Sequence, residues 1–241
     1  MGKEEIEFLT VVLAVFSVGY AAGATLTGGP CLALGASLHG ILLPDVAYLV
    51  RMWWINNLTP EMSDEEKLAA CTVTGSRVIQ DIDFDSMVLL PDLDRNGHMN
   101  NARYLRELCF SRRHFFKRLG LWRQLDACKT NAVIAAQTIR YRSEQFLFAR
   151  YSIHSRIVCY SDAEQSLYLE SRFVDKASDF VAAVHVCKYR LLGDKGDLPS
   201  KLLIAAGLRI TDLPDSTDRV PFLAHWAAAN AASSDELRPR K

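Results

Sequence analysis

The sequence has no net charge, because 28 lysine and arginine residues balance 28 aspartate and glutamate residues. A protein without a surplus of either sign has no long-range field to attract nucleic acid or an acidic surface. We therefore expect no nucleic-acid partner. The sequence also lacks internal repeats, and its 241 residues predict one sizeable core with an appendage.

Paired cysteines and clustered histidines are also missing. No two cysteines form a CxxC pair and no histidines lie at zinc-ligand spacing, so the sequence predicts no metal site and no cofactor. Irregular intervals in a chain of this size argue against a disulfide framework. We interpret the cysteines as small, mostly buried apolar residues of a reducing compartment: Cys31, Cys71, Cys109, Cys128, Cys159 and Cys187.

Charged side chains are absent from Phe8 to Pro44. About 20 apolar residues are enough to cross a bilayer as a helix. Phe8–Leu26 is the better candidate for such a helix, and the Gly-Gly-Pro that follows ends it. Cys31–Leu49 is a weaker second candidate because it contains a histidine, a proline and an aspartate.

These apolar stretches predict a signal anchor that holds the protein in a membrane, and the endoplasmic reticulum is the expected one. A cleaved signal peptide, which would give a secreted form, is one alternative. It requires a basic start, whereas Lys3 is outweighed by Glu4, Glu5 and Glu7. A buried pair of helices in a soluble protein is the other alternative.

The remaining chain divides by composition. Residues 1–57 form the hydrophobic anchor region, and the polar, acidic residues 58–75 are expected to be a linker with a short helix. Residues 76–215 are the predicted folded domain. Residues 216–241 are a predicted C-terminal tail with a short helix near Phe222–Ala232.

The predicted domain changes its hydrophobic period once. Met99–Leu119 has the 3.6-residue period of a helix, with asparagines at its start and Gly120 at its end. Arg112 and Phe110 interrupt the two faces of this helix, which a sheet or a second subunit wrapped around more than one side would explain. A strand is expected before the helix and four strands with period two after it, at Phe84–Leu90, Ala132–Arg142, Arg150–Tyr160, Ser166–Val174 and Phe180–Leu192. Short turns between them predict an antiparallel sheet and an α+β fold.

The chemically informative segment runs from Asp92 to Leu105 and enters this helix. Asp94, Asn96 and His98 alternate there, beside the free N–H groups and positive partial charge of a helix N-terminus. Such a terminus can stabilise the oxyanion of a thioester, while a carboxylate activates water or attacks directly. Ordinary turn chemistry explains the same residues, and this alternative stays open. A calcium loop is excluded because its twelfth position is Arg103 rather than glutamate.

The string Asp-Leu-Asp-x-Asn-x-His-x-Asn-Asn-x-x-Tyr resembles the signature that opens the central helix of hotdog-fold thioesterases. It is similar to the 4-hydroxybenzoyl-CoA thioesterase-like branch and to plant acyl-ACP thioesterases. From about Leu38 to the C-terminus the sequence is most similar to the animal family of thioesterase superfamily member 6. The resemblance implies a single hotdog domain, in which an antiparallel sheet wraps a long central helix, preceded here by the membrane segment.

The resemblance also implies roles for individual residues. The implied catalytic residues are Asp94, Asn96 and His98, and the implied substrate-binding residues are Gly97, Asn100, Asn101 and Tyr104. It further implies a homodimer with the active site between subunits, which residues of the first long strand would reach: Gln137, Arg140, Tyr141 and Arg142.

Two functions remain open from the sequence. The first is an acyl-CoA thioester hydrolase at an internal membrane, with an acyl-CoA or related acyl thioester as substrate. The second is an inactive hotdog protein at the membrane that binds acyl chains or protein partners.

Overall fold

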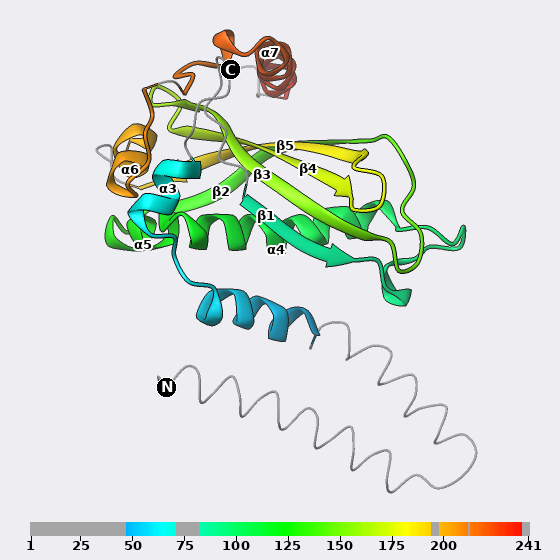
Figure 1. The fold of residues 1–241 in the computed structure, drawn as a ribbon. Coiled ribbons are helices and arrows are strands. Elements are labelled where there is room, and N and C mark those ends of the chain that lie inside the picture. The colour runs from blue at the N-terminus through cyan, green and yellow to red at the C-terminus, as the bar shows by residue number, and fades with distance from the viewer. Residues whose placement is uncertain (1–46, 71–81, 194–197, 212, 238–241) are drawn as a thin grey trace, which may run out of the picture. The chain divides into compact units, whose positions relative to one another are not determined.

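The computed structural model divides the chain into two compact units, Met1–Asn57 and Leu58–Lys241. The residues that the structure describes are 47–70, 82–193, 198–211 and 213–237 (Figure 1). The described residues of the first unit, 47–57, belong to a helix that ends at residue 58. The expected membrane segment, Phe8–Leu26, lies outside the described residues. Within the described ranges, no helix combines the length and hydrophobicity needed to cross a bilayer.

One antiparallel sheet of five strands, in the order β1-β3-β4-β5-β2, forms the centre of the second unit. The strands are β1 (Ile82–Met87), β2 (Asn131–Tyr141), β3 (Arg150–Ser161), β4 (Ser166–Asp175) and β5 (Val181–Leu192). The four strands after the central helix agree with the predicted ones to about one residue at each end. The first strand begins and ends earlier than predicted. It ends earlier because Leu90–Asp92 forms the 3₁₀ helix η1. The antiparallel prediction is confirmed.

The central helix α4 (Asn101–Arg118) lies along one face of the sheet (Figure 1). The Asn100 side chain caps it by accepting a hydrogen bond from the Ala102 N–H. Gly120 follows its last turn with a φ of 72°, a left-handed conformation that favours glycine. The predicted helix is therefore confirmed. The short helix α5 (Leu121–Ala127) continues directly from this glycine and was not predicted.

The core fills the space between α4 and the inner face of the sheet. Leu108 of α4 is fully buried in a cluster that includes Ile153 of β3 and Phe173 of β4. The Tyr104 ring meets the Phe173 ring edge-on, with 4.9 Å between centroids. Burying one such large apolar side chain stabilises a fold by about 1.5–3 kcal/mol, so this cluster fixes where α4 lies.

The two residues that interrupt the helical pattern, Phe110 and Arg112, are both buried. An Arg112 N–H group lies 3.4 Å from Cys109 Sγ. The positive charge of Arg112 also contributes, after burial, to the lowered pKa of His185 on β5. The sheet therefore approaches α4 at a polar position as well as along the apolar stripe, as predicted for Arg112.

A β-bulge interrupts the pairing of β2 with β5. Ile134 pairs with Tyr189 and Ala136 pairs with Lys188, so Ala135 is an additional residue on β2. Before the bulge Ala132 packs against the core, and after it Ile139 does. The bulge thus changes which residues of β2 face α4.

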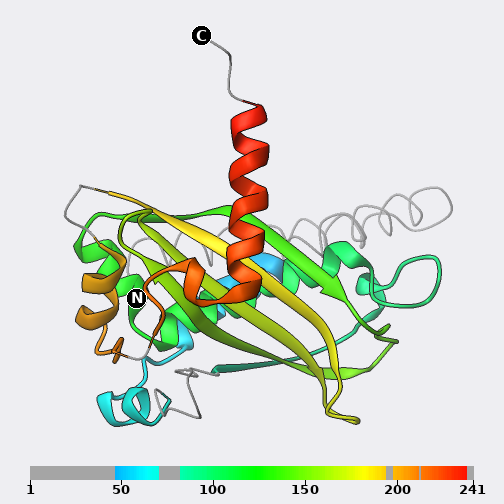
Figure 2. The ribbon, with the colours of Figure 1, turned by 90° about the horizontal axis from the view of Figure 1, so that it is seen from above.

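Helix α7 (Pro221–Glu236) begins over the opposite, outer face of the sheet (Figures 1 and 2). Its Leu223 is buried in a cluster with Tyr168 and Val186. Figure 2 shows that the rest of α7 runs out past the sheet, and its residues after Asn230 are exposed. The C-terminal region therefore covers part of the outer face. The helix α6 (Pro199–Ala205), which was not predicted, lies before it in the chain.

The region expected to be a linker contains helix α3 (Asp64–Ala70). The Met62 N–H donates a 2.8 Å hydrogen bond to the Arg118 carbonyl at the end of α4. Lys67 is buried, and its side chain lies next to Gly120. This segment packs against the domain, so a stable fragment must include it.

A chain of three buried hydroxyl groups ties α4 to two strands. Ser155 Oγ of β3 lies 3.1 Å from Ser111 Oγ of α4 and 2.9 Å from Ser171 Oγ of β4. All three side chains are inaccessible to water. Ser155 therefore satisfies two buried polar groups at once.

We predict that Ser155→Ala lowers the free energy of unfolding by about 1–3 kcal/mol, because it leaves two buried hydroxyls with fewer partners. The triple variant Ser111→Ala, Ser155→Ala, Ser171→Ala should lose less than the sum of the three single variants, because it leaves no partner behind. Urea denaturation of all four variants measures this. Strictly additive losses would show that the three hydroxyls do not act as one network.

Candidate active site

The candidate site is a tight turn that delivers the chain into α4. Leu93 and Met99 form an isolated antiparallel bridge, and the Asp94 N–H donates a 3.0 Å hydrogen bond to the His98 carbonyl. The Gly97 N–H bonds to the Asp94 carbonyl, and Gly97 has a φ of 81°, which only glycine adopts readily. The turn therefore brings the first and fifth residues of Asp-Arg-Asn-Gly-His together.

Asp94 and His98 meet across this turn. His98 Nδ1 lies 3.6 Å from Asp94 Oδ2, and both side chains are about three-quarters buried. Asp94 Oδ1 accepts a 2.8 Å hydrogen bond from the Asn96 N–H. One carboxylate oxygen is thus used by the backbone, and the other faces the imidazole.

Glu144 is a further member of the site that the sequence did not indicate. It follows β2, and its Oε1 lies 3.8 Å from His98 Nε2. The backbone of His98 bridges to Phe146 in the same loop, which explains the approach. The imidazole therefore stands between two carboxylates, one on each ring nitrogen.

Four of the remaining predicted residues lie in the turn or at the start of α4. Asn96 and Gly97 lie on the exposed tip of the turn, and Asn96 contacts Asp94 through its backbone N–H. Asn100 uses its side chain to cap α4. Asn101 has an exposed side chain, and its carbonyl accepts a 3.0 Å hydrogen bond from the Tyr141 hydroxyl of β2. These contacts position the loop and the helix.

Tyr104 belongs to the core. Its ring lies edge-on to Tyr141 and Phe173, and burial raises the pKa of its hydroxyl to about 12. Tyr104 therefore supports Tyr141, which in turn holds the first turn of α4. A direct contact between Tyr104 and a substrate would require the substrate to enter this core.

Asp92 holds the segment between η1 and α4 in place. Its Oδ2 accepts a 2.9 Å hydrogen bond from the Leu89 N–H at the start of η1, and its Oδ1 lies 3.9 Å from Arg103 Nε. The Asn100 N–H bonds to its carbonyl. The sequence did not indicate this structural role of Asp92, whose carboxylate organises the entry to α4.

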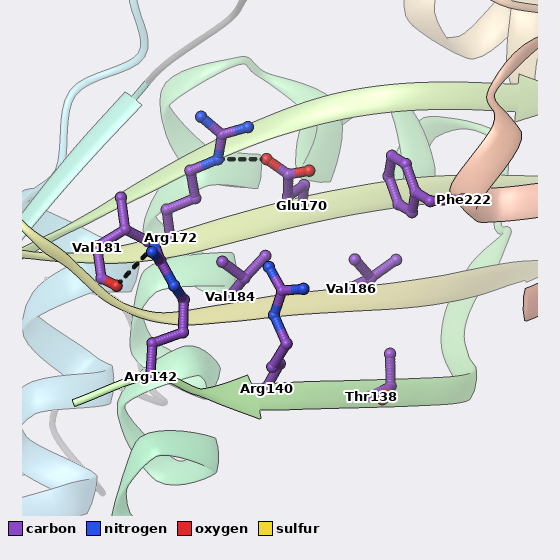
Figure 3. Close-up of a pocket in the computed structure, with 9 residues that line it drawn as sticks. All are labelled: Thr138, Arg140, Arg142, Glu170, Arg172, Val181, Val184, Val186 and Phe222. Atoms are coloured by element: carbon purple, nitrogen blue, oxygen red, sulfur yellow. Dashed lines mark hydrogen bonds and ion pairs between the residues drawn. The ribbon is translucent and has the colours of Figure 1, made fainter. Parts of the chain in front are cut away.

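The four residues expected near the site on or directly after β2 lie on two faces of the sheet. Tyr141 packs on Tyr104, and Gln137 Oε1 lies 3.2 Å from Nε2 of the buried His185, so both face α4. Burial, with a smaller effect of Arg112, lowers the pKa of His185 to about 3, so its ring is neutral. Arg140 and Arg142 line a cavity on the opposite face (Figure 3). Neighbouring residues of a strand point to opposite faces, so Arg140 lies on the face away from Tyr141. The expectation that these residues reach a site between two subunits stays a prediction.

Comparison with known families identifies the chain. The profile of the thioesterase-like superfamily matches residues 88–220, which is more than half of the sequence. The chain belongs to the thioesterase-like superfamily. Protein THEM6 of Danio rerio is 36% identical over 195 residues, covering 80% of this chain and 87% of that protein. Protein THEM6 of Xenopus laevis is 34% identical over 161 residues, covering 67% and 74%. The predicted relation to the member 6 family is confirmed.

This THEM6-like chain is also similar to solved structures. YbaW, a probable thioesterase from Escherichia coli, is 20% identical and gives a TM-score of 0.46, covering 52% of this chain and 94% of YbaW. Membership of the thioesterase-like superfamily agrees with a thioester hydrolase. In the part of the THEM6-like chain that the structure describes, no three His, Cys, Asp or Glu side chains converge as metal ligands would.

Proposed function

We propose that this protein hydrolyses acyl-CoA thioesters at the turn that enters α4. The observation that carries the proposal is the pairing of Asp94 with His98 at 3.6 Å, beside the N-terminus of the central helix of a thioesterase-like chain. An ionisable pair at a helix N-terminus combines a base with a site for a developing negative charge.

In the proposed reaction, Asp94 acts as general base. Its Oδ2 takes a proton from water, the water oxygen attacks the thioester carbonyl carbon, and the C–S bond breaks. The CoA thiolate leaves and takes up the proton held by Asp94, and the acyl group leaves as a carboxylic acid. The positive end of the α4 dipole stabilises the oxyanion as it forms. Attack by Asp94 itself, through an acyl-enzyme anhydride that water then opens, has the same net balance.

His98 and Asn96 act as positioning residues in this proposal. His98 holds Asp94 Oδ2 through Nδ1, and Glu144 lies near the other ring nitrogen. The Asn96 N–H fixes Asp94 Oδ1, so one oxygen remains for water. Gly97, Asn100, Asn101 and Tyr104 shape the turn and the helix start against which the substrate would bind.

A second function, binding without hydrolysis, is favoured by one specific observation. The bond from the Asn96 N–H to Asp94 Oδ1 is the bond that any aspartate makes in a local turn. An inactive protein that binds acyl chains or protein partners would keep Asp94 for this reason alone. The two functions differ in what they require of Asp94 Oδ2.

We predict that Asp94→Asn lowers kcat for acyl-CoA hydrolysis by about 100-fold or more, because an amide cannot accept the proton. The bond from the Asn96 N–H can persist, since asparagine keeps an oxygen at this position. A spectrophotometric thiol-release assay over a range of acyl chain lengths, with a thermal melt for each variant, measures both effects.

Asp175→Asn is the matched control. Asp175 Oδ1 accepts hydrogen bonds from the Ala177 and Ser178 N–H groups in the turn after β4, far in sequence from the site. It should show a similar small loss of thermal stability and unchanged kcat. Asp92→Asn would be a poor control because Asp92 supports η1. Wild-type turnover by Asp94→Asn, or no turnover by the wild type on any chain length, would favour the binding function.

We further propose that the N-terminal region anchors the protein in the endoplasmic reticulum membrane. The charge-free stretch from Phe8 to Pro44 supports this, because it is long enough to cross a bilayer. The folded domain would then act at a membrane surface, where acyl chains are concentrated.

We predict that the full chain stays in the membrane pellet after high-salt and carbonate washes, because burial of about 20 apolar residues is insensitive to ionic screening. A chain that begins at Leu58, which retains α3 and its contacts, should appear in the supernatant. Cell fractionation with immunoblotting measures this. Release of the full chain by salt alone would contradict the anchor.

We propose that the protein forms a homodimer through β2. This strand is an edge of the sheet, 11 residues long and largely exposed, and it carries the exposed apolar residues Val133 and Ile134. A long edge strand of this kind pairs readily with another strand. Such pairing would bring a second subunit beside Tyr141 and the start of α4.

We predict that sedimentation equilibrium of the chain from Leu58 gives about twice the monomer mass, and that Ile134→Lys shifts it toward the monomer. A charge at the edge opposes strand pairing with an identical copy. The control is Leu237→Lys, at the exposed residue that follows α7, and it should leave the dimer unchanged. A wild-type monomer at high protein concentration would contradict pairing through β2.

A further inference from the structure

A cavity of about 600 Å³ opens on the outer face of the sheet, on the side away from α4 (Figure 3). Its lining comes from four elements. Arg140 comes from the end of β2, and Arg142 directly follows that strand. Arg172 comes from β4, Val184 and Val186 from β5, and Phe222 from α7. This volume is large enough for a small organic molecule and much too large for a single ion.

The cavity carries a surplus of positive charge. Glu170 is the carboxylate of its lining, and its Oε1 is shared between Arg172 Nε at 2.5 Å and Arg156 at 2.7 Å. Glu170 and Arg156 are both buried. One negative charge is therefore already divided between two guanidinium groups, and it neutralises neither Arg140 nor Arg142.

Arg140 of β2 and Arg142, which follows that strand, remain available to an anion. Arg142 donates a 3.1 Å hydrogen bond to the Val181 carbonyl and stacks 4.7 Å above the Phe180 ring, which holds its guanidinium in place. Arg140 forms no ion pair with a carboxylate among the described residues. Figure 3 shows its guanidinium directed over the floor of the cavity, near Val184. Two guanidinium groups that line one cavity can bind one anion together.

The floor and the far wall of the cavity are apolar. Val184 and Val186 lie side by side on β5, and the Phe222 ring stands at the end toward α7 (Figure 3). A purely inorganic anion would leave this surface in contact with water. An apolar group attached to the anion would cover it, with a gain of about 25 cal/mol for each Å² removed from water.

We propose that this cavity binds a phosphomonoester that carries an apolar chain or ring. A phosphomonoester is a dianion near neutral pH and presents three acceptor oxygens, which suits two guanidinium groups that form no ion pair among the described residues better than a monocarboxylate does. A lipid phosphate and the phosphate of a nucleotide share this chemistry. The site lies on the opposite face from Asp94, so its occupancy does not depend on the proposed hydrolysis.

The test is isothermal titration calorimetry of the full chain in neutral detergent micelles, with n-octyl phosphate as the probe. Wild-type protein should bind octyl phosphate more tightly than either octanoate or inorganic phosphate. Arg140→Gln should weaken binding about tenfold or more, since hydrogen bonds between charged groups are the strong ones. Phe222→Ala should weaken binding of octyl phosphate and leave binding of inorganic phosphate unchanged.

Arg190→Gln is the matched control, because Arg190 is an exposed arginine on β5 outside the cavity lining. It should bind octyl phosphate as the wild type does. Asp94→Asn should also bind as the wild type does, so a failure of the proposed hydrolysis leaves this result standing. Adenosine 3′,5′-bisphosphate is the second probe. Tighter binding of this probe than of octyl phosphate would identify a nucleotide as the source of the phosphate.

Three results would overturn the proposal. The first is no measurable binding of either probe at millimolar concentration. The second is equal binding of octanoate and octyl phosphate, which would remove the preference for phosphate. The third is an unchanged affinity in Arg140→Gln, which would place the bound anion outside this cavity.

Discussion

The contact between α4 and the inner face of the sheet determines where the candidate chemistry lies. Leu108 and Tyr104 pack against Ile153 and Phe173, and this apolar contact fixes the axis of the helix. The start of α4 is then held by Tyr141, whose hydroxyl bonds to the Asn101 carbonyl. The Asp94–His98 turn is attached to that start. A local turn motif thus gains a defined position only because a long helix is buried beside it.

The same interface contains polar groups that the apolar pattern alone would not require. Three serine hydroxyls, the Arg112 guanidinium and the neutral His185 ring lie between α4 and the strands. Buried polar groups restrict a helix to the positions in which they find partners, whereas apolar contacts tolerate sliding. The helix is therefore held along its axis as well as against the sheet, and the turn at its start gains the same restriction.

The sequence predicts the parts of this molecule that depend on local patterns. The period of two places the strands after α4, and the asparagines and Gly120 mark the ends of the helix, because capping and hydrogen bonding act over a few residues. The pairing of Asp94 with His98 is local for the same reason. Glu144 was missed because only the bridge from His98 to Phe146 brings its loop to the site. Helices α5 and α6 were missed because seven residues are too few to show a helical period. The role of Asp92 was missed because its partner at Leu89 belongs to a 3₁₀ turn that no pattern indicates.

The bulge at Ala135 changes whether the even-numbered or the odd-numbered residues of β2 face the core. Before it the even-numbered Ala132 faces the core, and after it the odd-numbered Gln137, Ile139 and Tyr141 do. This single additional residue is what sends Tyr141 to the helix and its neighbour Arg140 to the outer cavity. Deleting Ala135 would remove the bulge and leave a regular ladder in which Gln137, Ile139 and Tyr141 keep their partners on β5. A deletion after the bulge would instead shift the following residues to the opposite face. The number of residues between the bulge and Tyr141 is therefore under tighter constraint than most of their side chains, and insertions or deletions there should be far less tolerated than substitutions.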